Sequence, residues 1–271
     1  MSPLSDAHRA QIDAVRGKVL RFVGAVWSGM PNYRRDAIET RFLDAVVPVV
    51  KAGQIQVAEI TNAYLLAQAK QLGIGMKAAT VDADKVTGLR PVTYAEEYSR
   101  PATSVYAALA EGQGFDQAKK LGAGRLMSLV ATDLQMSYVH QARATMKGGA
   151  FTFFTRIPRG VETCALCLVA STQRYRRGNL MPIHPGCDCG MEIHKGDVDP
   201  GQILQPEQLE KYHAAVAAKT GTDAGSWDVF GGRDARGIVD YRKLLAVREH
   251  GEYGPTLTWL GDRFTGPTGI N

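Results

Sequence analysis

All four cysteines of this chain lie in one stretch, CALCLVASTQRYRRGNLMPIHPGCDC, which begins at Cys164. Cys164 and Cys167 form a C-x-x-C pair, and Cys187 and Cys189 form a C-x-C pair after nineteen intervening residues. His184 lies three residues before Cys187. Thiols and an imidazole gathered in this way can hold a metal ion, close disulfides, or carry out thiol redox chemistry.

The spacing favours a structural zinc site. A C-x-x-C turn lets two thiolates meet one tetrahedral cation, and a second ligand pair about 15–20 residues later completes the set. Pro185 and Gly186 fit a tight turn that directs the second group back toward the first. We expect the C-x-x-C pair to be joined by two of the three later candidates. The five candidate ligands for the four positions are Cys164, Cys167, His184, Cys187 and Cys189.

The two other interpretations of the cysteines are weaker. A thioredoxin-like redox site would need a βαβ setting, and no such alternation surrounds the C-x-x-C pair. Stable disulfides belong to oxidising compartments. The first residues, MSPLSDAHRAQIDAV, lack the apolar run of a signal peptide, and no stretch reaches the ~18 uninterrupted apolar residues of a membrane-spanning helix. We therefore expect a soluble, non-secreted protein.

Motifs for catalysis are missing from the sequence. It contains no G-x-S-x-G, no H-E-x-x-H and no P-loop. His140, Ser171 and His194 are isolated parts, whereas a protease needs a base and an orienting group beside its nucleophile. Glu162 would act on a zinc-bound water only at an open metal position, and four protein ligands leave none. We name no catalytic residue, and enzymatic activity is the weaker hypothesis.

Arginines flank a tyrosine in QRYRRG, between the two cysteine pairs. The chain carries a formal net charge of +5 and has a pI of about 9.0, which permits contact with nucleic acid but does not require it. Arginines beside an aromatic ring can grip phosphates or stack on bases. The plainer interpretation is a solvated basic loop. The candidate nucleic-acid contacts are Arg174, Arg176 and Arg177.

The elements that must position these residues fall into two regions. Residues 1–149 carry apolar side chains at helical spacing, and Phe115 to Met146 forms the longest such run. From residue 150 the pattern changes, because AFTFFTRI is aromatic and β-branched as in a strand. We predict a helical domain over 1–149 and a cysteine-rich module with a C-terminal tail over 150–271. The predicted fold is mainly α, with long N-terminal helices and a smaller C-terminal α+β zinc-knuckle-like module.

Local signals refine this outline. We expect Pro48 and Gly53 to bend or divide the second helix, and Pro101 to interrupt a helix whose capping box starts at Thr93. Beyond the cysteines, PEQLEKYHAAVAAKTG and GIVDYRKLLAVREHG are predicted helices. GPTLTWLGDRFTG is predicted as a short strand or hairpin.

The combination of C-x-x-C with a later H-P-x-C-x-C resembles the phage Mu F-like minor head proteins, a head-morphogenesis family in which a helical part leads into such a module. HGEYGPTLTWLGDRFTGP is similar to the ending of family members from phages of actinobacteria. Asp188 departs from the pattern, because many members have a basic residue there. The residues that carry the resemblance are Cys164, Cys167, His184, Pro185, Cys187 and Cys189.

This resemblance implies a minor capsid protein with a structural role in head assembly or DNA packaging near the portal. The implied partners are the portal protein and the major capsid protein, with packaged DNA as a further contact and no membrane. The implied location is the virion, inside the phage capsid, after assembly in the host cytoplasm. Related phage genes in this position are often labelled capsid maturation proteases acting on capsid or scaffold protein, which is the alternative function.

Overall fold

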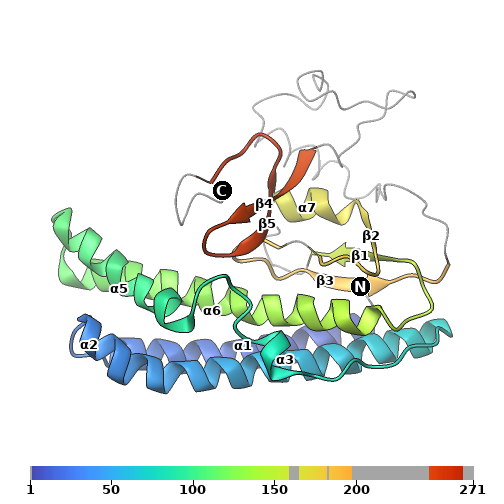
Figure 1. Ribbon diagram of the computed structural model, residues 1–271, viewed down its shortest axis with the longest axis horizontal. Coiled ribbons are helices and arrows are strands. Elements are labelled where there is room, and N and C mark those ends of the chain that lie inside the picture. The colour runs from blue at the N-terminus through green and yellow to red at the C-terminus, as the bar shows by residue number, and fades with distance from the viewer. Residues whose placement is uncertain (1, 159–164, 182, 197–243, 265–271) are drawn as a thin grey trace. The chain divides into compact units, whose positions relative to one another are not determined.

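A computed structural model describes residues 2–158, 165–181, 183–196 and 244–264 (Figure 1). Its helices are α1 Pro3–Ser28, α2 Arg35–Ala37, the π-helix η1 Ile38–Phe42, α3 Leu43–Leu72, α4 Ala83–Val86, α5 Tyr94–Ala110, α6 Phe115–Met146 and α7 Ala165–Ser171. Its strands are β1 Phe153–Ile157, β2 Arg174–Arg176, β3 Gly190–Ile193, β4 Leu245–His250 and β5 Gly254–Trp259. The predicted fold class is confirmed: long N-terminal helices precede a small module with antiparallel strands.

The chain divides into two compact units. The helical unit comprises Met1–Tyr64 and Ala78–Ala144, and the cysteine unit comprises Leu65–Lys77 and Thr145–Asn271. Within the helical unit the apolar stripes of the long helices form the core, as their spacing predicts. The side chains buried to 1% exposure or less include Val23, Trp27, Phe42, Val46, Val57, Tyr98, Leu126 and Leu129.

The second long helix is not divided at Pro48 or Gly53, and the predicted interruption of the third at Pro101 is wrong. Helix α3 continues through Pro48 and Gly53, and α5 continues through Pro101. Gly53 serves close packing, because a Cβ there would lie 2.7 Å from Val19 Cγ2 of α1. The predicted capping box of α5 is confirmed by the reciprocal hydrogen bonds between Thr93 and Glu96.

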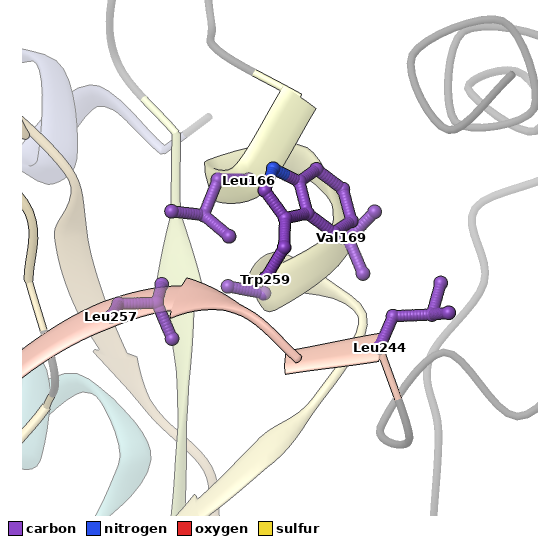
Figure 2. Packing of buried hydrophobic residues seen from close by; sticks show 6 residues of the cluster. Leu166, Val169, Leu244, Leu257 and Trp259 are labelled. Atoms are coloured by element: carbon purple, nitrogen blue, oxygen red, sulfur yellow. The ribbon is translucent and has the colours of Figure 1, made fainter. Parts of the chain in front are cut away.

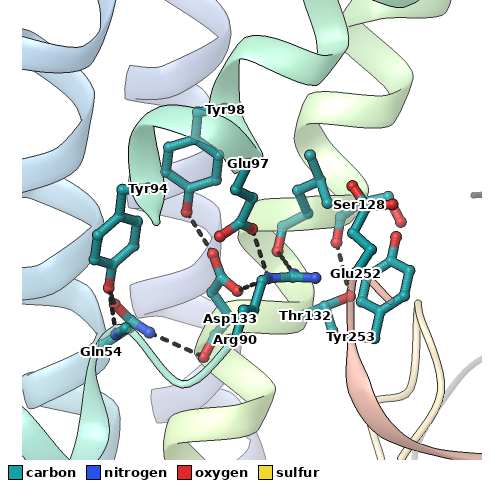
Figure 3. A network of polar contacts seen from close by, with 12 residues as sticks. Gln54, Arg90, Tyr94, Glu97, Tyr98, Ser128, Thr132, Asp133, Glu252 and Tyr253 are labelled. Carbon is teal, nitrogen blue, oxygen red and sulfur yellow. Dashed lines mark hydrogen bonds and ion pairs between the residues drawn. The ribbon is translucent and has the colours of Figure 1, made fainter. Parts of the chain in front are cut away.

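A polar network lies inside the helical unit (Figure 3). Arg90 Nε is 2.6 Å from a carboxylate oxygen of Glu97 and 2.6 Å from one of Asp133. Tyr98 donates a hydrogen bond of 2.5 Å to Asp133 Oδ2, and Tyr94 donates one of 2.7 Å to a Gln54 oxygen. Burial and the two carboxylates raise the pKa of Tyr98 well above its ordinary value. The helical unit thus neutralises a buried guanidinium with its own carboxylates.

In the cysteine unit, β1 is the centre of a three-stranded antiparallel sheet with the order β2-β1-β3. The predicted strand in AFTFFTRI is confirmed as β1. Phe154 and Arg156 lie two residues apart on β1, so they share a face of the sheet. Tyr175 of β2 stacks on Phe154, with 5.4 Å between the ring centroids, and its hydroxyl donates to Ala170 O of α7. This face of the sheet is therefore the one linked to α7.

The hairpin β4–β5 forms the second part of this unit. GIVDYRKLLAVREHG was predicted as a helix, and its described part is instead β4, because its residues pair along their length with β5. The strand predicted at GPTLTWLGDRFTG is confirmed as β5. The predicted helix at residues 206–221 lies outside the described residues. The hairpin and α7 share a buried apolar cluster (Figure 2): Leu166, Val169, Ala170, Leu244, Leu257 and Trp259.

Candidate metal centre

Three of the five predicted ligands converge in the cysteine unit. Cys167 Sγ lies 2.9 Å from His184 Nε2 and 4.0 Å from Cys187 Sγ. The three ligand atoms all lie within 4.8 Å of one another, which suits a common metal ion. Both cysteines are buried, and His184 is partly exposed. The fifth candidate, Cys164, lies outside the described residues.

Cys189 adjoins this group. Its side chain is 1% exposed and lies two residues from Cys187, outside the group of three ligand atoms that are all within 4.8 Å of one another. It directly precedes Gly190, the first residue of β3, so the sheet fixes its backbone. The described candidates therefore comprise three thiols and one imidazole.

Helix α7 positions Cys167. The helix has only seven residues, but Leu166, Val169 and Ala170 bury one side of it against the β4–β5 hairpin. Packing therefore stabilises a helix that is too short to form by itself. Cys167 is buried on the same helix, and the apolar cluster fixes the place of its thiol.

A tight turn positions His184 and Cys187. Cys187 N donates a hydrogen bond of 3.0 Å to His184 O, and Gly186 has a φ of +76°. Pro at the second position and a positive φ at the third are the requirements of a type II turn. The predicted turn at Pro185 and Gly186 is therefore confirmed. Leu257 N of β5 donates a hydrogen bond of 2.7 Å to the carbonyl directly before this turn, on Ile183.

The ring of His184 is oriented for ligation. Its Nδ1 lies 2.8 Å from Pro185 O, and only a protonated nitrogen can donate to a carbonyl. In the neutral ring this leaves Nε2 with a free lone pair, directed at Cys167 Sγ. A backbone carbonyl that fixes the tautomer in this way is the usual support of a metal-binding histidine.

The electrostatics of the cluster favour a thiolate. Hydrogen bonds from Cys167 and Cys189 lower the pKa of Cys187 well below its ordinary value, against the effect of burial. The positive charge of Arg156 acts in the same direction. The thiolate is the form of cysteine that binds metals.

The described cysteines do not form disulfides. No two of Cys167, Cys187 and Cys189 are joined by a disulfide, and the 4.0 Å between the sulfurs of Cys167 and Cys187 is about twice a disulfide bond length. For these three residues the disulfide interpretation is wrong. A soft donor set of thiols and imidazole suits a borderline-soft cation, whereas Ca²⁺ and Mg²⁺ take oxygen ligands.

The predicted basic loop is a strand in its first part, because Arg174 to Arg176 pair with β1 as β2. Arg176 is exposed over the ring of Phe153, with its Cζ 6.0 Å from the centroid. Arg177 donates a hydrogen bond to Gly149 O. Burial, with the charge of Arg174, lowers the pKa of His194 to about 4. Contact of these arginines with nucleic acid stays a prediction.

Two of the side chains considered for catalysis, Ser171 and His194, have structural contacts, whereas Glu162 lies outside the described residues. Ser171 Oγ donates a hydrogen bond of 2.7 Å to Leu168 O at the end of α7. His194 Nε2 lies 2.7 Å from Thr155 Oγ1. Burial is the main cause that lowers the pKa of His140 in α6 to about 4.

Sequence reasoning missed Arg156, which lies beside the cluster. Its Nη1 donates to Cys167 Sγ over 3.9 Å, and the side chain is buried. The sequence signal for Arg156 was a charged residue among the aromatic and β-branched residues of FFTRI. A charge is rarely buried without a partner, so its position indicated a special environment.

A scan of protein-family models, a search of curated proteins and a search of solved structures each found no match to this chain. Among the helices that the structure describes, none is both long and apolar enough to span a membrane.

Proposed function

We propose that this chain is a structural minor protein of a phage head, of the Mu F-like kind, whose cysteine unit is held together by zinc. The observation that carries the proposal is the convergence of Cys167, from the C-x-x-C, with His184 and Cys187, from the H-P-x-C-x-C. The same two motifs carry the sequence resemblance to that family. Cys189 or Cys164 completes the ligand set.

Zinc fits this role because of its ligand chemistry and because of the unit's construction. Zinc binds thiolate and imidazole in tetrahedral structural sites with four protein ligands. The cysteine unit has short strands and a seven-residue helix, which bring little apolar surface together. A bound metal contributes directly to the folding free energy of such a module. Its ligands would join α7 to the turn before β3.

The proposed partners follow from the family resemblance. The long helices of the helical unit would present a surface to the portal or major capsid protein. Arg174 and Arg176 would face packaged DNA, and Arg176 is exposed for this purpose. The proposed place of the chain is inside the capsid, near the portal.

Metal analysis of protein purified without chelator tests the zinc site. We expect one zinc per chain by native mass spectrometry, and we expect EDTA to release it. Serine at Cys167 or Cys187 should abolish zinc binding, whereas Ser171→Ala, on the same helix as Cys167, should retain it. A metal-free wild-type chain would refute the zinc site.

Locating the chain tests the role in the head. We expect it at low copy number in purified particles, near the portal in averaged images. Phage that carry Cys167→Ser should assemble few filled heads, and Ser171→Ala phage should assemble normally. Normal heads made without a folded cysteine unit would refute the structural role.

The maturation protease is a second candidate, favoured by the 2.9 Å between Cys167 Sγ and His184 Nε2, which suits a thiol–imidazole pair. Against it, Cys167 is only 3% exposed, so a substrate would not reach its sulfur. The protease hypothesis predicts that Cys167→Ala leaves capsid or scaffold protein unprocessed while the fold of the cysteine unit stays intact. The masses of capsid subunits before and after maturation decide between the two functions.

A further inference from the structure

Arg156 is a buried cation without an acidic partner among the described residues. Its side chain lies on the central strand β1 and is 2% exposed. Its Nη1 donates to Cys167 Sγ over 3.9 Å, while Nε and Nη2 have no hydrogen-bond partner in the described part of the chain. A guanidinium stays protonated in proteins, so its charge needs compensation where it is buried.

The surroundings of Arg156 identify the compensating groups. One neighbour is the ring of Tyr175, whose centroid lies 6.0 Å from Arg156 Cζ. The other is the sulfur of Cys167, 3.9 Å from Nη1, and this sulfur lies 4.0 Å from that of Cys187. Of these groups, the sulfurs are the ones that become anions as metal ligands. The countercharge of Arg156 therefore lies in the cysteine cluster.

A count of formal charges then selects a ligand set. Three thiolates around Zn²⁺ with a neutral imidazole leave one negative charge, and one guanidinium cancels it. Two thiolates with two neutral ligands would leave the arginine's charge uncompensated, and four thiolates would leave one negative charge in excess. With Cys167, His184 and Cys187 as ligands, either Cys189 or Cys164 would supply the third thiol of such a set.

We propose that Arg156 is a positioning residue that balances the charge of a centre with three thiolates and one imidazole, and that it strengthens metal binding at that centre. The inference rests on the proposed zinc site and extends it to the residue beside it and to the ligand set. Arg156 would donate to sulfur and would not touch the metal.

The test compares the full-length wild-type chain with Arg156→Met, which keeps length but removes charge, and with Arg156→Lys, which keeps charge. Zinc affinity is measured by competition with a chelator. We expect the Met variant to bind zinc about 10–100-fold more weakly, as removal of outer-shell partners does. We expect the Lys variant to recover most of that loss. Arg176→Met, an exposed arginine of the adjacent strand, is the matched control and should not change the affinity.

Cobalt spectra provide a readout that a packing role would not change. Co²⁺ in the wild-type site should show sulfur-to-cobalt charge-transfer bands with the intensity of three thiolates. Because the guanidinium donates to a ligand sulfur, these bands should shift in the Met variant and return toward the wild-type position in the Lys variant. A wild-type intensity that corresponds to two or four thiolates would overturn the charge count.

The outcomes separate this inference from the proposed function. A wild-type chain that binds neither zinc nor cobalt refutes the metal site and the inference with it. Equal zinc affinity in wild type and the Met variant refutes the inference alone. If circular dichroism shows that the Met variant is unfolded, the Lys variant decides: near-wild-type affinity supports the charge role, and a loss beyond 10-fold overturns it.

Discussion

Each of the two units buries an arginine, and the groups that surround the guanidinium differ between the units. Arg90 of the helical unit lies 2.6 Å from each of two carboxylates, and its Nη2 donates to Leu129 O. Arg156 of the cysteine unit has sulfur in place of carboxylates, and two of its nitrogens have no hydrogen-bond partner among the described residues. The same buried cation therefore faces oxygen anions in one unit and sulfur in the other, where the compensating charge would come from metal-bound thiolates.

The difference concerns what each unit needs in order to fold. Carboxylates are ionised at neutral pH without help, so the network around Arg90 is complete within the chain. Buried thiols become a stable set of anions chiefly when a metal binds them. We therefore expect the helical unit to be self-sufficient and the cysteine unit to depend on its metal. The first two predictions below test this contrast, and the third tests how closely the helical unit is packed.

Removal of the metal should have the largest effect. Structural zinc contributes about 10–16 kcal/mol in small zinc modules, so EDTA or Cys187→Ser should unfold the cysteine unit. Hydrogen exchange should show lost protection in β1, β3 and α7 and retained protection in α1 and α5. Re-addition of zinc to the EDTA-treated wild type should restore the protection. Uniform loss of protection in both units would contradict the contrast.

Removal of Arg90 should lower the stability of the helical unit only. Arg90→Met leaves two buried carboxylates without a cation, which costs about 3–5 kcal/mol. Denaturant unfolding followed by circular dichroism measures this loss, and the zinc content should stay at the wild-type value. The control is Arg35→Met, which removes an exposed ion pair with Glu39 of the same 2.6 Å length and should change stability little. Equal effects of the two variants would show that burial does not matter here.

Two glycines of α6 should respond in opposite directions. A Cβ on Gly122 would lie 2.6 Å from Val105 Cγ2 and 2.7 Å from Trp27 Cζ2, so Gly122→Ala should destabilise the helical unit by about 1–3 kcal/mol. Gly124 has nothing within 4 Å of such an atom, and Gly124→Ala should stabilise by up to about 1 kcal/mol through helix propensity. Thermal unfolding of both variants measures the difference. If both substitutions changed the stability in the same direction, the requirement for glycine at position 122 would not come from close packing.

The site was predictable where its determinants are local. The ligand types, their spacing and the Pro185–Gly186 turn are all visible within 26 residues of sequence, and the turn has the predicted form. The apolar stripes of the long helices are equally local signals, which is why the fold class could be predicted.

The remaining features depend on contacts between distant residues. The segment from Leu245 to His250 has apolar residues that fit a helix, but pairing with β5 makes it a strand. From the sequence, Gly53 reads as a helix breaker. In the structure it allows the close approach of Val19, which a Cβ at this position would prevent. Arg156 gave only the weak signal of a charge in a strand, because its partners come from α7 and from the turn before β3. Tertiary contacts of this kind override local propensity.

The hydrogen bond from Leu257 N to Ile183 O has a consequence for synthesis of the chain. The ribosome makes Cys167, His184 and Cys187 well before it makes β5, which fixes the backbone beside the ligand turn and completes the cluster that covers α7. A nascent chain that has reached only Cys189 therefore carries all the candidate ligands without the strand that packs on α7. We expect the ligand site to reach its final geometry only after β5 has emerged, because β5 supplies both the packing on α7 and the hydrogen bond beside the ligand turn.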